Sequence, residues 1–520
     1  MTRAPAAGET WLVRALLAAY ALFFLWQALA LDASSLVNGV LDDSFYYLQV
    51  ARHMAAGHGS TFDGVEPTNG YHPLWLWLLV PIQRLVADPI ASMRAALLLS
   101  GALGLTSLVV IGRILTRVGA AAAVPIALLV FAWPRLAKQT TSLLETPLVL
   151  LLYLLVFDAL LSFDLSRRRA RVALGALLGL ACLARLDSVF LLAAFAVFAA
   201  LDGREPKLLG RAQRVFEPLF VAGLFLTPYL IWNLTVFGHL QPISGAMKSS
   251  FPQPGLQLEP WRAFPEFVLL LLAGGVFLGV ALLRRERWLQ VLGLFGMAAL
   301  LHALYTALFM VWGVDVWHFT LLLPIALLGL PWAFEQALRA TFRGRRGLGL
   351  ARWVVLTVGV AAAFALQTRS LQLREGRHLD VTRGLALWAR DSLPADAVFA
   401  GTDTGVFAYF SGRTTVNLDG LINNYRYRDA LLSGRFREYL DERGVDYIFD
   451  QFAVGRPDWI DGTYETRSLR IWDRPRNRVA GEVVLHREDE VRRIRLLSRQ
   501  TLGSNERAPN AITLWKLRLP

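Results

Sequence analysis

The sequence predicts a mainly α-helical protein, a polytopic bundle of about eleven transmembrane helices followed by a soluble α/β domain. The chain of 520 residues is 55% hydrophobic and only 18% charged, with a mean hydropathy of +0.44, whereas soluble domains carry about 25% charged residues. Apolar stretches close to the roughly 20 residues of a spanning helix recur as far as residue 368, and charged residues concentrate after it. We therefore predict a membrane domain over residues 1–370 and a soluble domain over 371–520, and we exclude an ordinary soluble enzyme and a disordered chain.

Eleven apolar stretches are expected to form the helices of the membrane domain. They span residues 12–31, 93–112, 119–136, 144–162, 172–184, 188–201, 216–236, 264–283, 289–311, 317–336 and 352–368. The stretches 172–184 and 188–201 are short and are separated by Arg185 and Asp187. Because charges are costly within a membrane, we expect a tight helix pair whose charges lie at the water interface or face the protein interior.

The segment 72–86 is apolar but shorter than a spanning helix. A full crossing here would invert every later loop, so we interpret it as a re-entrant or interfacial helix, or as half of a broken pair. Trp75 and Trp77 are typical of a membrane interface.

Basic residues concentrate in alternate loops of the membrane domain. These loops cover residues 113–117, 167–171, 203–214, 284–287 and 339–352. Because cytoplasmic loops carry an excess of Lys and Arg, we place them and the N-terminus in the cytoplasm of a cell with an inner (plasma) membrane. The soluble domain is then periplasmic or extracellular, and the first helix serves as an uncleaved anchor. The net charge of +13 records this orientation, and we expect no nucleic acid partner.

Residues 371–520 alternate helix-like and strand-like pieces, which indicates a small α/β module. Helices are expected at 379–393, 404–412 and 436–444, and strands at 397–403, 413–420, 445–450 and near the three terminal segments 482–486, 494–497 and 512–519. No Gly-rich phosphate-binding loop of standard spacing is found. Asp403, Arg413, Asn417 and Asp419 at the strand ends are expected to bind an acceptor or, as is commoner, to cap loops.

The first outer loop, residues 32–92, carries the strongest functional signal. Asp42 and Asp43 are adjacent, a helix with aromatic residues follows, and a glycine-rich loop comes next. A partly desolvated carboxylate beside another acid has a raised proton affinity and can accept a proton from a hydroxyl, so the pair is a candidate general base. The alternative is structural, with either acid capping the helix that begins near Ser44.

The segment LDDSFYYLQVARHMAAGHGSTFDGVEPTNGYHPLW, residues 41–75, resembles the first outer loop of the GT-C superfamily of membrane glycosyltransferases. That superfamily includes protein O-mannosyltransferases, the aminoarabinose transferase of lipid A and mycobacterial arabinofuranosyltransferases. TSLLETPL at 141–148 looks like its second outer-loop acid, and LARLDS at 183–188 is similar to its Ala-Arg-Xaa-Asp segment. FAGTDTGVFAYFSGRTTVNLDGLIN and YLDERGVDYIF resemble the periplasmic domain of bacterial members.

The resemblance implies a reaction. Such enzymes take a sugar from a polyprenyl-phosphate carrier on the outer face of the membrane, and the first acid of the loop pair deprotonates the acceptor hydroxyl. The anomeric carbon inverts and the lipid phosphate leaves. Asp42 is then the expected base and Asp43 the fallback. The implied partners are a lipid-linked hexosyl or pentosyl donor, the bilayer, and a glycan, lipid or protein acceptor.

Further polar residues near the outer helix ends are candidates for substrate binding. They are Tyr71, His72, Arg135, Lys138, Glu145, Arg185, His239, Lys248 and His318. A cation would hold the leaving phosphate through charge-assisted hydrogen bonds. Arg135 and Lys138 could instead extend to the interface, and Arg185 could form a local ion pair with Asp187.

The remaining candidates also have two interpretations each. Glu145 either supports the site or is a helix-start acid favoured by the macrodipole. His239 could contact the sugar or the phosphate. His318 lies in the outer turn 312–319 near Trp312 and Trp317, and these two tryptophans either stack on a sugar ring or form an interfacial belt.

A metal cofactor is possible but not favoured, and no other cofactor is expected. One cysteine, Cys182, lies in an apolar run, and no dense cluster of metal-ligand residues is found. The alternative function is a transporter or flippase of lipid-linked sugars, although no internal repeat of the kind common in transporters is found. An inactive sensor or scaffold with a periplasmic tail is a third possibility.

Overall fold

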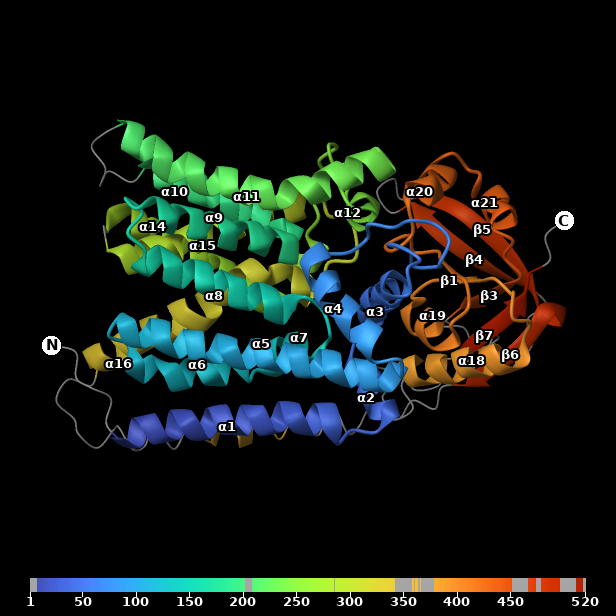
Figure 1. Ribbon diagram of the computed structural model, residues 1–520, viewed down its shortest axis with the longest axis horizontal. Coiled ribbons are helices and arrows are strands. Elements are labelled where there is room, and N and C mark those ends of the chain that lie inside the picture. Colours follow the sequence, from blue (N-terminus) through green and yellow to red (C-terminus); the bar gives the residue numbers. More distant parts are fainter. Residues whose placement is uncertain are drawn as a thin grey trace.

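The computed structural model describes residues 7–201, 208–284, 286–341, 378–450, 466–473, 478–495 and 511–517, with five further residues between 358 and 365. Figure 1 shows an elongated molecule with long, roughly parallel helices at one end and a mixed α/β domain at the other. The predicted boundary between residues 370 and 371 lies outside the described residues.

The membrane domain contains helices on the predicted apolar stretches and shorter helices between them. They are α1 (Ala7–Leu29), α2 (Ala33–Gly39), α3 (Asp42–Ala55), α4 (Pro73–Leu85), α5 (Pro89–Arg117), η1 (Ala121–Ala123), α6 (Val124–Phe131), α7 (Pro134–Thr141), α8 (Thr146–Ser162), α9 (Arg168–Ala184), η2 (Leu186–Ser188), α10 (Val189–Leu201), α11 (Leu208–Phe237), α12 (Ile243–Lys248), α13 (Glu259–Ala263), α14 (Pro265–Leu283), α15 (Arg287–Phe309), η3 (Val316–Leu322), η4 (Ile325–Gly329) and α16 (Leu330–Thr341). Ten of the eleven predicted stretches contain such helices, and the last, 352–368, lies mostly outside the described residues.

The described helices make the protein a multi-pass membrane protein by length and composition. Four of them are long and apolar enough to cross a membrane: α5, α14, α15 and the Ala212–Phe237 part of α11. The number rises to six if each of two bent pairs is one span, α1 with α2 and η3 with Ile325–Thr341. Fewer helices reach full length than the sequence predicts, because η1 with α6, α8, and η2 with α10 are shorter apolar helices.

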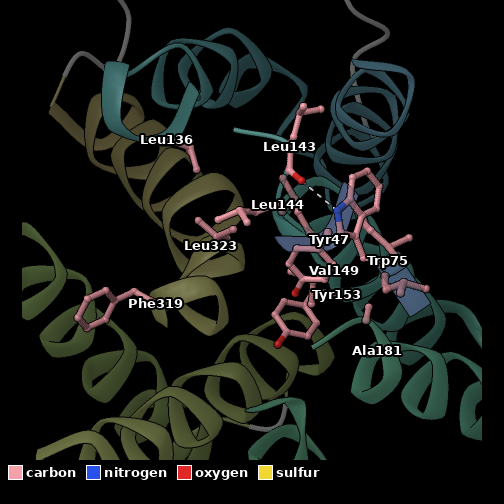
Figure 2. Packing of buried hydrophobic residues seen from close by; sticks show 14 of the residues in the cluster. Tyr47, Trp75, Leu136, Leu143, Leu144, Val149, Tyr153, Ala181, Phe319 and Leu323 are labelled. Carbon is pink, nitrogen blue, oxygen red and sulfur yellow. Dashed lines mark hydrogen bonds between the residues drawn. The ribbon is translucent and has the colours of Figure 1, made fainter. Parts of the chain in front are cut away.

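The segment 72–86 forms α4, which packs inside the protein. Trp75 is fully buried, and its Nε1–H donates to the backbone oxygen of Leu143 at 3.0 Å, the dashed line in Figure 2. Trp77 is 43% exposed. The interfacial position expected for both tryptophans is therefore wrong for Trp75, because its indole belongs to the hydrophobic core that also holds Tyr47 and Val149.

The soluble domain is built on a five-stranded sheet of order β2-β1-β3-β7-β6. Its strands are β1 (Phe399–Gly401), β2 (Thr415–Asn417), β3 (Tyr447–Asp450), β6 (Glu490–Arg495) and β7 (Ala511–Lys516), and a separate hairpin joins β4 (Thr466–Asp473) to β5 (Arg478–His486). The helical elements are α18 (His378–Ser392), α19 (Gly405–Ser411), α20 (Tyr425–Leu432), α21 (Phe436–Glu442) and η7 (Arg487–Asp489). β1 pairs in parallel with β2 and β3, whereas β7 is antiparallel to β3 and β6. The α/β module predicted from the sequence is thus present, and β4 is the strand that was not predicted.

The soluble domain and the first outer loop form one packed unit. The fully buried ring of Phe45 in α3 lies 5.7 Å from the ring of Tyr409 in α19. Arg52 donates to the backbone oxygen of Tyr409 at 2.8 Å, and its guanidinium lies 4.6 Å from the centre of that ring. A Cβ atom at Gly70 would come within 2.0 Å of the backbone oxygen of Leu421, so only glycine fits this approach. The position of α3 therefore depends on the soluble domain.

Candidate functional site

The two adjacent carboxylates at the start of α3 point in different directions, because neighbouring helical residues project about 100° apart. The Oδ2 and Oδ1 atoms of Asp42 accept hydrogen bonds from the backbone N–H groups of Gly405 and Val406, both at 2.9 Å. Asp43 lines a cavity instead. The expected capping of their own helix is not observed, since the cap position of α3 is Leu41 and has no side-chain hydrogen bond. Asp42 caps α19 of the soluble domain.

The cavity beside Asp43 lies where the membrane domain meets the soluble domain and has a volume of about 360 Å³. Its polar and aromatic lining residues are Asp43, Tyr46, Tyr47, Tyr71, His72, Glu145, Arg185, Asp187, Phe190, Gln241, Ser244, Lys248, Tyr305, Trp317 and His318. These residues come from most of the segments that the sequence analysis predicts on the outer side of the membrane. The fold brings these segments together at one end of the helices. We call this space the transfer cavity.

A buried ion network forms one wall of the transfer cavity. The guanidinium of Arg185, 2% exposed, pairs with Glu145 and with Asp187, the latter at 2.9 Å. The hydroxyl of Tyr47 donates to Glu145 at 3.1 Å. His72 lies 3.7 Å from Glu145 and accepts at Nδ1 from the N–H of Leu186, and burial lowers its pKa, which favours the neutral ring. The wall is therefore fixed in place by charge pairs and by a neutral histidine.

Two cations and one acid are available to a ligand in this cavity. The Nε–H of Arg185 is buried and has no hydrogen-bond partner among the described residues. Lys248, 8% exposed, donates to the backbone oxygen of Gly313 at 3.2 Å, and burial lowers its pKa while Asp43 raises it. Burial raises the pKa of Asp43 to about 6, and Lys248 opposes that rise. A buried donor without a partner is costly, so the wall is suited to an anionic or polar ligand.

Two of the polar residues predicted at the strand ends of the soluble domain, Asn417 and Asp419, contact Tyr46 of α3. The hydroxyl of Tyr46 donates to Asp419 at 2.9 Å, and the amide of Asn417 donates to the same carboxylate oxygen at 2.9 Å. The backbone N–H of Asp403 donates to Asp419 at 3.0 Å, and burial raises the pKa of Asp403 to about 8. Arg413 donates to the backbone oxygens that end α18 and precede β1. These contacts match the expected loop capping.

The structure brings most of the predicted site residues together. Those that line the transfer cavity are Asp43, Tyr71, His72, Glu145, Arg185, Lys248 and His318. Asp42 lies outside the lining, and so does His239, whose ring stacks on Tyr425 at a centroid distance of 3.9 Å. Arg135 and Lys138 belong to α7, but their side chains lie outside the described part of the chain.

Other lining residues were not predicted from the sequence. Tyr305 and Gln241 line the cavity, yet Tyr305 lies within an apolar helix and no local pattern distinguishes it. Of the two tryptophans considered for an interfacial belt, Trp317 lines the cavity, and the indole N–H of Trp312 donates to the backbone oxygen of Met247 at 2.8 Å. Both are thus engaged with the site or its supporting helix.

Within the described part of the chain, no group of three or more His, Cys, Asp or Glu side chains is arranged to hold a metal ion. Glu145 and Asp187 are instead paired with Arg185, and Asp42 is directed to the soluble domain.

Sequence comparisons match only the soluble domain. A family model described as a domain of unknown function (DUF8728) matches residues 369–491. A comparison with curated proteins gives no significant match.

Comparisons of structure extend over nearly the whole chain. ArnT from Cupriavidus metallidurans bound to undecaprenyl phosphate aligns with a TM-score of 0.55 and 15% identity, covering 92% of this chain and 98% of ArnT. An Archaeoglobus fulgidus oligosaccharyltransferase tethered with an acceptor peptide gives 0.49 and 11% identity, covering 84% and 69%. The arabinofuranosyltransferase AftD from Mycobacteria gives 0.48 and 16% identity, covering 98% and 40%. The alignment with ArnT, which spans both chains almost entirely, shows that this protein shares the fold of ArnT, as the resemblance in its sequence predicts.

Proposed function

We propose that the protein transfers a sugar from a polyprenyl-phosphate carrier to an acceptor hydroxyl, with inversion at the anomeric carbon. One observation carries this proposal: the transfer cavity contains a partly buried carboxylate, Asp43, together with two buried cations, Arg185 and Lys248. A base for the acceptor and partners for the leaving phosphate are the two requirements of the reaction. The ArnT structure of the same fold was obtained with undecaprenyl phosphate, which supports a lipid carrier of this class.

Asp43 is the better candidate for the general base. Both oxygens of Asp42 accept backbone hydrogen bonds from α19, so Asp42 is directed away from the cavity. The first acid of the pair is the base that the family resemblance implies, and our assignment moves this role by one residue. With a pKa raised to about 6, Asp43 is ionised at neutral pH yet more basic than an ordinary carboxylate, which suits proton acceptance from a hydroxyl.

The proposed step conserves atoms and charge. The acceptor oxygen attacks the anomeric carbon while its proton passes to Asp43. The bond between that carbon and the carrier phosphate breaks, and the phosphate keeps the electron pair. Lys248 and the Nε–H of Arg185 stabilise the negative charge that develops on the phosphate oxygen.

The basic loops support an orientation of the protein in the membrane. We propose that the N-terminus is cytoplasmic and that the transfer cavity and the soluble domain face the periplasm or cell exterior, because alternate loops carry the excess of Lys and Arg. A donor anchored in the bilayer then enters the cavity laterally between helices.

The experiment that tests the proposal uses purified full-length protein, radiolabelled undecaprenyl-phosphate sugars and a cell-envelope extract as acceptor. We expect label to move to the acceptor, and Asp43→Asn to lower the rate by about 10²–10⁴. Glu259→Gln, at an exposed acid of α13, is the matched control and should keep the full rate. Full activity of Asp43→Asn would remove the assigned base, and transbilayer movement of label without transfer would establish a flippase instead.

A further inference from the structure

A second cavity of about 240 Å³ lies on the other side of α12 from the transfer cavity. Met247 lines this second cavity, and the next residue, Lys248, lines the transfer cavity. The opposite wall comes from α20 and from the end of β4 in the soluble domain. Figure 1 shows α12 at the end of the helices that faces α20. We call this second space the junction cleft.

The junction cleft is lined by an aromatic ring and by polar groups, the kinds of side chain that bind carbohydrates. Trp472 of β4 is 39% exposed, and an indole face packs against the C–H face of a sugar ring. Beside it lie a guanidinium, Arg428, a carboxylate, Asp473, and an amide, Gln253, which can donate to and accept from hydroxyls. Arg478 pairs with Asp473 at 3.3 Å and orients it.

The cleft and the transfer cavity are separate spaces that share α12 as a common wall. A Cβ atom at Gly420 would lie 2.7 Å from the end of the Met247 side chain, so α12 is held closely against the soluble domain. The hydroxyl of Ser249, which lines the cleft, bonds to the hydroxyl of Tyr305, which lines the transfer cavity, at 3.1 Å. A molecule held in the cleft therefore contacts α12, whose Lys248 lines the transfer cavity together with Asp43.

We propose that the junction cleft binds the acceptor and that the acceptor is a glycan, an inference that rests on the proposed transfer reaction. A glycan seated on Trp472 extends past α12 and presents its terminal hydroxyl to Asp43. A peptide acceptor fits less well, because only the last two residues of β4 line the cleft, too few for an extended peptide to add as a strand.

The test measures binding and transfer separately with the full-length protein. The binding probes are oligosaccharides released from bacterial cell-envelope polysaccharides, arrayed beside peptides rich in Ser and Thr or carrying Asn-Xaa-Thr. We expect oligosaccharide binding that Trp472→Ala weakens about ten-fold or more and Trp472→Phe largely restores. Val484→Ala, on the partner strand β5 and 48% exposed, is the matched control and should bind normally.

The transfer assay separates this proposal from the proposed function. Trp472→Ala should raise the acceptor KM and leave the slow hydrolysis of the donor without acceptor unchanged. The proposal that the junction cleft binds a glycan is overturned if the protein prefers the peptides, or if Trp472→Ala still binds the oligosaccharides normally. The proposed transfer reaction is tested separately, by donor turnover. If no donor is consumed but oligosaccharide binding depends on Trp472, the cleft binds a glycan, and the proposal that this glycan is the acceptor of the transfer reaction is rejected.

Discussion

The two faces of α3 differ more than its sequence suggests. One face carries Asp42, Phe45 and Arg52 and is packed and hydrogen-bonded to α19 of the soluble domain. The other carries Asp43 and Tyr47 and faces the transfer cavity. Two adjacent acids of identical chemistry thus have different surroundings, because a helix turns each residue by about 100°. A carboxylate pair in a sequence is better read as two positions on a helix than as one functional unit.

The largest loss of stability is expected on the cavity side, from Arg185→Gln. The substitution leaves the buried Glu145 and the partly exposed Asp187 without their cation, and breaking a buried ion pair in this way costs about 3–5 kcal/mol. Thermal unfolding of the purified protein measures the effect. Arg390→Gln is the control, because Arg390 and its partner Asp391 are both at least half exposed, and such surface pairs contribute about 0–1 kcal/mol. Equal unfolding temperatures for the two variants would contradict the network.

Asp42→Ala tests the face that is packed against α19. It leaves the buried N–H groups of Gly405 and Val406 without their acceptors, at a cost of about 1–3 kcal/mol for each group. We expect a lower unfolding temperature, and a lower kcat that still shows the pH dependence of an intact base. Asp42→Asn keeps one acceptor oxygen and should recover part of the stability. If the kcat of Asp42→Asn no longer depends on pH, Asp42 and not Asp43 is the general base.

Gly405→Ala probes the same contact without touching a charge. A Cβ atom at Gly405 would lie 2.3 Å from the backbone oxygen of Asp42 and 2.9 Å from its Oδ2, and such overpacking costs about 1–3 kcal/mol. Gly384→Ala is the control, since Gly384 lies exposed in α18 with nothing within 4 Å of the added atom. That change should stabilise its helix by about 0.5–1 kcal/mol. Opposite shifts of unfolding temperature are expected, and shifts of the same sign would refute close packing at Gly405.

The last prediction concerns pH, which should change the free energy of unfolding and the rate of transfer in opposite directions. Burial raises the pKa of Asp42 to about 7, of Asp43 to about 6 and of Asp403 to about 8. The folded chain therefore binds protons more tightly than the unfolded chain, so the contribution of these acids to the free energy of unfolding falls as pH rises from about 4 to about 8. Transfer should rise over the same change, through pH 6, as Asp43 ionises. Unfolding temperatures of Asp43→Asn at pH 5 and pH 8 should differ less than those of the unmodified protein, and an unchanged difference would contradict the contribution of Asp43.

Local patterns predicted the helices but not the directions of the side chains. Hydropathy located α1, α5 and α15, and the acidic pair located the start of α3, because both signals lie within a few turns of chain. The partner of Asp42 lies 363 residues away in sequence, so no periodicity reveals it. The stacking of His239 on Tyr425 is hidden for the same reason. Long-range contacts thus decided which predicted residues line the transfer cavity.

The hydrogen bonds between Asp42 and α19 also set an order of events during synthesis. The ribosome makes α3 when most of the chain is still to come, and its permanent partner begins at Gly405. Until that later part is made and folded, the first outer loop lacks the contacts that hold α3, and Asp43 has no fixed position. A half-made chain can therefore occupy the membrane before the transfer cavity is complete, because the soluble domain that holds α3 is made after the membrane domain.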